Sequence, residues 1–150
     1  MSLKALISKY LKDVKLMQLA TTVNKQPWIC SVWFCADKDL NIYFFSSINR
    51  RHSKEILKNN KVAAAFALPQ TPKDKPRGLQ LQGTASEVKN KKEISKATIL
   101  FTKRIFSLNQ IQELMNHRQK PHRFYKITPS QYVLFDALNF PDESRQEFNP

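Results

Sequence analysis

Three strand-like segments separated by two short polar turns lie in the first third of the chain, and they limit the folds open to it. The segments, Leu16–Val23, Trp28–Ala36 and Leu40–Ser46, are rich in the aromatic and β-branched residues that strands favour. The turns, Asn24-Lys25-Gln26-Pro27 and Asp37-Lys38-Asp39, consist of residues typical of tight turns. Connections this short join antiparallel neighbours, so the pattern predicts a β-meander.

Helices and further strands surround the meander. Apolar residues recur at helical spacing over residues 2–14, and a second helix is predicted over 50–59 with Ile56 and Leu57 on its apolar face. The continuous apolar run Val62–Leu68 predicts a buried strand. The remaining predicted elements are the strand Leu79–Val88, the helices over 91–105 and 108–117, and the strands Phe124–Ile127 and Tyr132–Phe135.

Six or seven strands with meander connections and a few helices predict a mainly β (α+β) fold. We expect an antiparallel barrel with flanking helices, in a single domain spanning residues 1–150. Strands and helices do not alternate as they do in a doubly wound parallel sheet. The chain has only two glycines, Gly78 and Gly83. A glycine-rich phosphate loop is therefore excluded, and with it the Rossmann and P-loop classes of nucleotide-binding protein.

The apolar segments and the cysteines favour a cytoplasmic protein. No apolar run approaches the roughly 20 residues of a membrane span, and lysines interrupt the N-terminal segment where a signal peptide would be apolar. Cys30 and Cys35 lie in one predicted strand, with Cα atoms about 16 Å apart, which is too far for a disulfide. We therefore expect two reduced, partly buried thiols and no membrane association.

The net charge of +13 raises the question of an anionic partner. Most of the basic residues are lysines scattered through every segment, whereas dedicated phosphate readers also use arginine forks. A solvated, lysine-rich surface is therefore favoured over nucleic-acid binding, and an anionic ligand or substrate also suits this charge.

The stretch Phe44–Lys54 carries the densest set of candidate binding residues. A hydrophobic strand runs into the hydroxyl residues Ser46 and Ser47, and basic residues follow as a helix begins. Hydroxyls, guanidinium groups and the free N–H groups of a helix start are the components of a phosphate site. A solvated basic helix start is an equally open interpretation of the same residues.

Other candidate sites have weaker support. His117 and His122 have loop-like spacing and no nearby cysteine in the sequence, so no metal site is predicted. No two carboxylates can be paired as acid and base, and no catalytic triad can be proposed from spacing alone, because triads are assembled in space.

The chain resembles the pyridoxamine 5′-phosphate oxidase-related family of FMN-binding split barrels, most closely its YhbP-like branch. The resemblance implies a six- to seven-stranded split β-barrel that forms a homodimer with FMN at the interface. It extends from the N-terminal helix over most of the chain. The segments that carry it are Trp28–Phe34, Phe44–Lys54, Asn59–Val62, Arg77–Gly83, Thr102–Phe106 and Phe124–Ile127.

The resemblance also implies roles for particular residues. Backbone groups of Ser31, Val32, Trp33 and Phe34 would contact the flavin ring, and the strand–helix junction with Ser47 would hold the phosphate. The family's aromatic–Thr pair falls on Phe45 and Ser46, and its Arg–Lys pair falls on Arg51 and His52. The family's strand glutamine falls on Gly78, so Gln80 is the candidate to replace it. Candidate cross-subunit contacts are Lys103, Arg104, Phe106, Phe124 and Tyr125.

Two functions from different classes follow from this resemblance. The first is a flavin-dependent oxidoreductase with FMN as cofactor and an unidentified small-molecule substrate. In such a protein the flavin supplies the redox chemistry, which fits the absence of an evident acid–base pair. The alternative is a non-catalytic module of the same fold that holds flavin or haem, with His52 as the candidate haem ligand.

Overall fold

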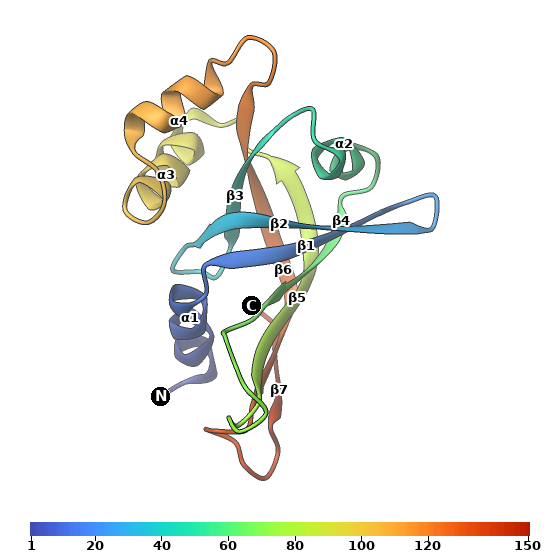
Figure 1. The fold of residues 1–150 in the computed structure, drawn as a ribbon, viewed down its shortest axis with the longest axis vertical. Coiled ribbons are helices and arrows are strands. Elements are labelled where there is room, and N and C mark those ends of the chain that lie inside the picture. The colour runs from blue at the N-terminus through green and yellow to red at the C-terminus, as the bar shows by residue number, and fades with distance from the viewer.

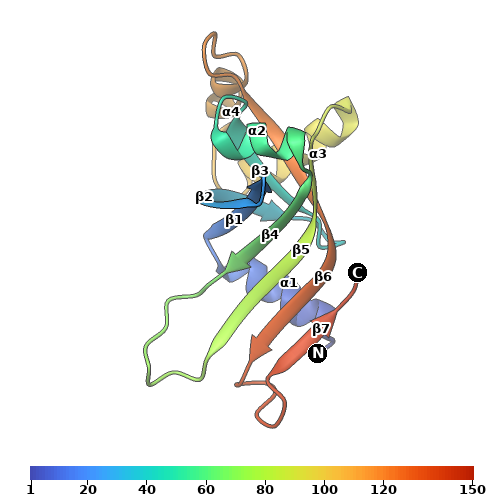
Figure 2. The same ribbon diagram turned by 90° about the vertical axis from the view of Figure 1, so that its right-hand side faces the viewer.

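The computed structural model describes all 150 residues, and its centre is an antiparallel sheet of seven strands curled into a barrel (Figures 1 and 2). The strands lie in the order β3-β2-β1-β4-β5-β6-β7, and a further pairing of β3 with β6 closes the barrel. The helices are α1 (Leu3–Asp13), α2 (Arg51–Lys58), α3 (Lys91–Thr102) and α4 (Leu108–Met115). The strands are β1 (Leu16–Val23), β2 (Gln26–Ala36), β3 (Ile42–Ser47), β4 (Lys61–Phe66), β5 (Arg77–Glu87), β6 (His122–Asp136) and β7 (Arg145–Phe148).

The predicted mainly β fold and its antiparallel barrel are confirmed. Six strands form the closed ring, and β7 extends the sheet beyond β6. Each consecutive pair in the ring is antiparallel, as the meander predicts. None of the four helices combines the length and the apolar character needed to traverse a bilayer.

Two apolar clusters fill the interior. The larger lies inside the barrel and beneath α1, whose Ile7, Tyr10 and Leu11 are buried. The smaller lies between the sheet and the pair α3–α4, with Phe45, Phe101 and Phe124 at its centre. α1 begins where the Ser2 hydroxyl accepts the N–H of Ala5, an N-cap that satisfies a free donor of the first turn.

Several boundaries differ from those predicted. The β1–β2 turn is confined to Asn24 and Lys25, which both have positive φ, so β2 begins at Gln26 rather than Trp28. The predicted strands Phe124–Ile127 and Tyr132–Phe135 are one continuous strand of 15 residues, because Pro129 is accommodated at a register shift against β5. β7 lies in the C-terminal segment, for which no strand was predicted.

Two predictions of burial were wrong. Leu57 is 78% exposed, because only one side of α2 faces the sheet and Leu57 lies next to, rather than above, the buried Ile56. The apolar run that begins at Val62 is not buried on both faces, since Ala63 in β4 is exposed. In this strand small apolar residues lie on the outer face of the barrel, where their lack of polarity does not indicate burial.

Candidate functional site

The junction between β3 and α2 brings the predicted hydroxyl and histidine residues together. All six residues of β3 are buried, and the strand ends at Ser47, four residues before α2 begins. The Ser46 Oγ lies 2.7 Å from the His52 Nε2, and the Ser53 hydroxyl donates to the Ser47 carbonyl at 2.8 Å. The Ser47 Oγ accepts the N–H of Asn49 at 3.2 Å. These bonds fix the direction in which α2 leaves the sheet.

His52 is an interior residue of this junction rather than a surface cation. It is only 6% exposed, and its ring lies beside that of Phe44. Burial, with a smaller contribution from the positive charge of Arg50, lowers the pKa of His52 below its ordinary value of 6.5. His52 is therefore a neutral hydrogen-bonding partner of Ser46 near pH 7.

Arg51 is held in place by residues from two strands and its own helix. Its Nε donates to Glu55 Oε2 at 2.9 Å, and its guanidinium lies 4.0 Å from the centre of the Trp28 ring. The Thr21 hydroxyl donates to the other oxygen of Glu55 at 2.7 Å. The hydrogen bonds from Arg51 and Thr21 lower the pKa of Glu55, so this carboxyl stays ionised near neutral pH.

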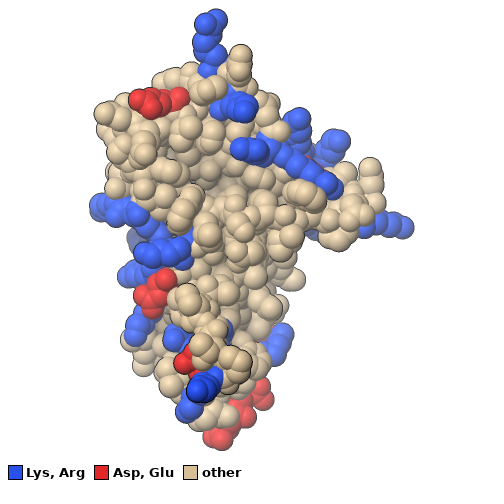
Figure 3. All heavy atoms as spheres, viewed as in Figure 1, with Lys and Arg blue, Asp and Glu red and all other residues tan.

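The first turn of α2 is open to an anion. Its N-cap, Arg50, provides no side-chain hydrogen bond, and the turn contains no acidic residue. Free N–H groups and the helix dipole both favour negative charge at such an end. A hollow of about 350 Å³ extends along α2 from this turn, and it is lined by Arg51, Lys54 and Lys58 together with the carboxylate of Glu55. Figure 3 shows Lys and Arg side chains over the region that α2 occupies in Figure 1.

The segment Ser31–Phe34, whose backbone is predicted to contact the flavin ring, lies on β2 with side chains that are alternately exposed and buried. Ser31 and Trp33 are exposed, whereas Val32 and Phe34 point into the core. β2 pairs with β1 from Gln26 to Trp33, but with β3 only from Phe34 to Ala36. Along Gln26–Trp33 the other edge of β2 therefore has unpaired backbone N–H and carbonyl groups. The contact between Trp28 and Arg51 joins this strand to the start of α2.

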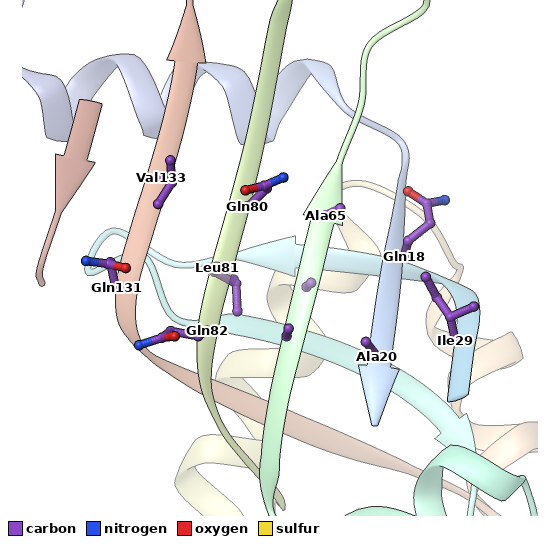
Figure 4. A pocket seen from close by; sticks show the side chains of 11 residues that line it. Gln18, Ala20, Ile29, Ala65, Gln80, Leu81, Gln82, Gln131 and Val133 are labelled. Carbon is purple, nitrogen blue, oxygen red and sulfur yellow. The ribbon is translucent and has the colours of Figure 1, made fainter. Parts of the chain in front are cut away.

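Gln80 is a predicted site residue that lies apart from the Ser31–Phe34 segment. It projects from the outer face of β5 into a hollow of about 420 Å³, together with Gln18 and Ala65 (Figure 4). Ser31, Gln18, Ala65 and Gln80 are successive partners across four strands. At the usual strand spacing, Ser31 and Gln80 are about 14 Å apart within one chain.

The five candidate cross-subunit residues are mostly engaged within their own chain. The Arg104 guanidinium donates to the carbonyls of Lys12 and Val14, and so caps the end of α1. Phe124 and Tyr125 are buried, and Phe106 packs against the smaller cluster. Only Lys103 is exposed.

Thr21, Trp28 and Glu55 belong to the surroundings of Arg51 and were not predicted as site residues. Glu55 follows Arg51 by four residues on the same helix, a spacing at which ion pairs form, so the sequence contained a signal for it. Thr21 and Trp28 reach the site only through the tertiary arrangement of the β1–β2 hairpin against α2.

The burial of His52 predicts a loss of stability in mild acid. Since the pKa of His52 is lower in the folded protein than its ordinary value, the unfolded chain binds a proton more readily as pH falls below about 6.5. We expect the free energy of unfolding to decrease between about pH 7.5 and about pH 5.5. Urea unfolding of the wild type and of His52→Gln should show a weaker pH dependence in the variant. Identical pH dependence in the two proteins would contradict this assignment.

Comparison with known proteins agrees with this architecture. A family model described as pyridoxamine 5′-phosphate oxidase matches residues 3–135. A conserved hypothetical protein of Mycobacterium tuberculosis has a similar solved structure, with a TM-score of 0.76, 16% identity, and coverage of 95% of this chain and 89% of that chain. General Stress Protein 26 of Bacillus anthracis str. Sterne aligns over 100% of both chains, with a TM-score of 0.71 and 17% identity. HutZ, the haem storage protein of Vibrio cholerae, has a TM-score of 0.67 and 19% identity, covering 86% of this chain and 91% of that chain.

No curated protein sequence matches the chain. The solved structures, at these low identities, establish the shared split-barrel-like fold and nothing more specific. The family model covers the chain from α1 to the end of the closed barrel. The chain therefore belongs to the pyridoxamine 5′-phosphate oxidase family.

Proposed function

We propose that this chain is an FMN-binding protein that acts as a flavin-dependent oxidoreductase on a small-molecule substrate still to be identified. The observation that carries the proposal is the open, basic start of α2, where Arg51 is pre-positioned beside free backbone N–H groups. Membership of the pyridoxamine 5′-phosphate oxidase family supports the same ligand.

The residues at the β3–α2 junction fit a phosphate monoester. Such a group carries close to two negative charges near pH 7 and three acceptor oxygens. Arg51 and the first-turn N–H groups would supply charged and neutral donors, and Ser46 and Ser47 would supply hydroxyls. His52, being neutral, would act through a ring N–H rather than as a cation.

The free edge of β2 fits the polar rim of a flavin ring. Unpaired backbone groups along Ser31–Trp33 provide donors and acceptors at strand spacing, and Phe34 anchors the strand in the core. Bound FMN would supply the redox chemistry, so the protein's tasks are to bind it, to orient it and to limit its access to water. Phe45, buried against Phe124, would hold the junction rigid behind the phosphate.

The proposal includes a homodimer with the cofactor at its interface, in the cytoplasm. One chain leaves the exposed Ser31 and Trp33 without a covering layer, and Gln80 lies too far away to join them within that chain. A second subunit is the simplest source of residues that would cover Ser31 and Trp33 and complete the site. The free thiols of Cys30 and Cys35 are consistent with a reducing compartment.

Mass spectrometry of the small molecule released from purified protein tests this proposal. We expect FMN, together with the visible absorbance of oxidised flavin in the intact protein. A colourless protein that also fails to bind added FMN would exclude the proposed cofactor. Reduction of the bound flavin by NADH or NADPH, followed by reoxidation by a defined acceptor, would support the oxidoreductase assignment over a passive binding role.

Haem binding is the second candidate, because HutZ, described as a haem storage protein, shares the fold. Against it, the His52 Nε2 is already hydrogen-bonded to Ser46 and the ring is buried. Titration with haem discriminates the two candidates. A Soret band that is lost in His52→Ala would favour haem, whereas FMN binding without such a band would favour flavin.

A further inference from the structure

The guanidinium of Arg51 is held in a way that leaves its Nη groups free. Its Nε donates to Glu55 Oε2 at 2.9 Å, and its central carbon lies over the Trp28 ring, 4.0 Å from the ring centre. The Nη groups carry four of the five donors of an arginine, and here they make no hydrogen bond within the chain. The side chain is 47% exposed, so these donors are accessible to a ligand.

Other arginines of the chain are held differently. Arg104, Arg123 and Arg145 all donate through Nη atoms, either to backbone carbonyls or to a carboxylate. Such bonds use donors with which a guanidinium binds an oxyanion through two parallel hydrogen bonds. Arg51 keeps these donors available, because its ion pair is made through Nε.

The carboxylate of Glu55 is fixed by a second short contact. Its side chain is only 12% exposed, and its Oε1 accepts the hydroxyl of Thr21 at 2.7 Å. Because Thr21 engages one oxygen, Glu55 contacts Arg51 with the other oxygen alone, rather than with the two-bond geometry common in such pairs. Thr21 is buried in β1, so the carboxylate is anchored to the sheet.

The β1–β2 hairpin provides a partner for each member of the Arg51–Glu55 pair. Thr21 and Trp28 are direct cross-strand partners. Thr21 bonds to Glu55, and Trp28 contacts the arginine one turn earlier on α2. Figure 1 shows the hairpin beside α2, and both of its strands contact this helix. Trp28 also precedes Ser31 by three residues on β2, so the strand proposed to contact the flavin ring also orients Arg51.

Charge does not explain a carboxylate at this position. An exposed Arg–Glu pair contributes little to stability, and a negative charge beside Arg51 opposes an incoming anion. What the Glu55 carboxylate can contribute to phosphate binding is orientation, because it restricts a flexible side chain before the ligand arrives.

We propose that Glu55 and Thr21 are positioning residues for FMN, which hold Arg51 by its Nε so that its Nη groups meet the phosphate. This role rests on the proposed function, because it concerns the same phosphate. Neither residue has to touch the ligand, since Thr21 acts through Glu55 and Glu55 acts through Arg51.

Glu55→Gln and Glu55→Met form a matched pair that tests this role. Both side chains are uncharged, similar in length and good helix formers, but only Gln can accept from the Arg51 Nε and donate to the Thr21 oxygen. We expect FMN to bind the Gln variant about three- to tenfold more tightly than the Met variant, the cost of leaving one side chain unrestricted. Riboflavin should bind both variants equally. The difference for FMN should vanish when each change is combined with Arg51→Ala, and fluorescence titration measures all of these affinities.

Exchange of the Arg51 Nε–H with water, followed by NMR in the ligand-free protein, provides a readout that does not depend on FMN. The signal is assigned by its absence in Arg51→Lys. We expect slow exchange in the wild type and in Glu55→Gln, where the hydrogen bond is kept, and faster exchange in Glu55→Met. Equal exchange in the two Glu55 variants would overturn the positioning role.

Circular dichroism verifies that each variant is folded. Thr21→Val, which removes only the hydroxyl, should cause a smaller loss of FMN affinity with no loss for riboflavin, and it decides the question should Glu55→Met fail to fold. Equal FMN affinities of the two Glu55 variants, an equal loss for riboflavin, or a difference that persists without Arg51 would overturn the positioning role while FMN binding stands. A wild type that binds no FMN would contradict the proposed function itself, and the positioning role with it.

Discussion

Gly83→Ala is expected to destabilise the protein by about 3 kcal/mol or more, one of the largest effects available to a single methyl group in this chain. A Cβ at Gly83 would lie 2.4 Å from the carbonyl oxygen of Thr128 and 2.9 Å from the Cα of Pro129. Both atoms belong to the backbone of β6, at the register shift where β5 and β6 pair. The steric clash of this Cβ with the β6 backbone can be relieved only if the two strands separate, and that separation disturbs the closed barrel.

Gly78→Ala provides the matched control on the same strand. A Cβ at Gly78 would meet no atom within 4 Å, and neither glycine has a positive φ. We expect this change to be neutral or to stabilise slightly, because alanine restricts the unfolded chain. Thermal unfolding should show a decrease in melting temperature of about 10 °C for Gly83→Ala, at about 3 °C per kcal/mol, and little change for Gly78→Ala. Equal melting temperatures would contradict the close approach of β5 and β6.

Arg51→Ala is expected to weaken FMN binding by about ten- to a hundredfold, the loss of one charge-assisted hydrogen bond to a phosphate. The guanidinium is pre-positioned by Glu55 and Trp28, so the folded protein has already restricted the side chain before the ligand arrives. Riboflavin, which lacks the phosphate, should bind the variant and the wild type equally. Fluorescence titration of both ligands measures the two effects.

Arg145→Ala controls for the removal of one positive charge and one ion pair. Arg145 pairs with Glu147 on β7, as Arg51 pairs with Glu55, and it is about as exposed. Its loss should leave the dissociation constant for FMN unchanged. An equal weakening by both substitutions would indicate that net charge alone attracts the ligand, and would remove Arg51 from the site.

The fold was largely predictable from local signals. The turns after Val23 and Ala36, the strands between them and the helical spacing of α1 are short-range features, and the structure confirms them. β7 was not predictable, because Arg145–Phe148 is short and polar and becomes a strand only by pairing with β6. The prediction that Leu57 lies on the buried face of its helix was wrong, because an apolar residue in a short helix does not specify the side that faces the core.

The candidate site was predictable only in part. The stretch Phe44–Lys54 predicted Ser46, Ser47 and Arg51 as candidate binding residues, and the structure brings Ser46 and His52 into contact. The sequence did not indicate that His52 is buried and neutral, because its burial depends on how α2 packs against the sheet. Trp28 and Thr21 are far from Arg51 in sequence, so their contacts with Arg51 and Glu55 depend on the tertiary structure. Membership of the YhbP-like branch stays a prediction.

The dissociation constants of the wild-type protein for FMN and for riboflavin test whether the start of α2 binds the flavin phosphate. The two ligands share the ring and differ in the phosphate that the start of α2 is proposed to bind. We expect FMN to bind at least about tenfold more tightly than riboflavin. Equal affinities, or the absence of binding by either ligand, would contradict it.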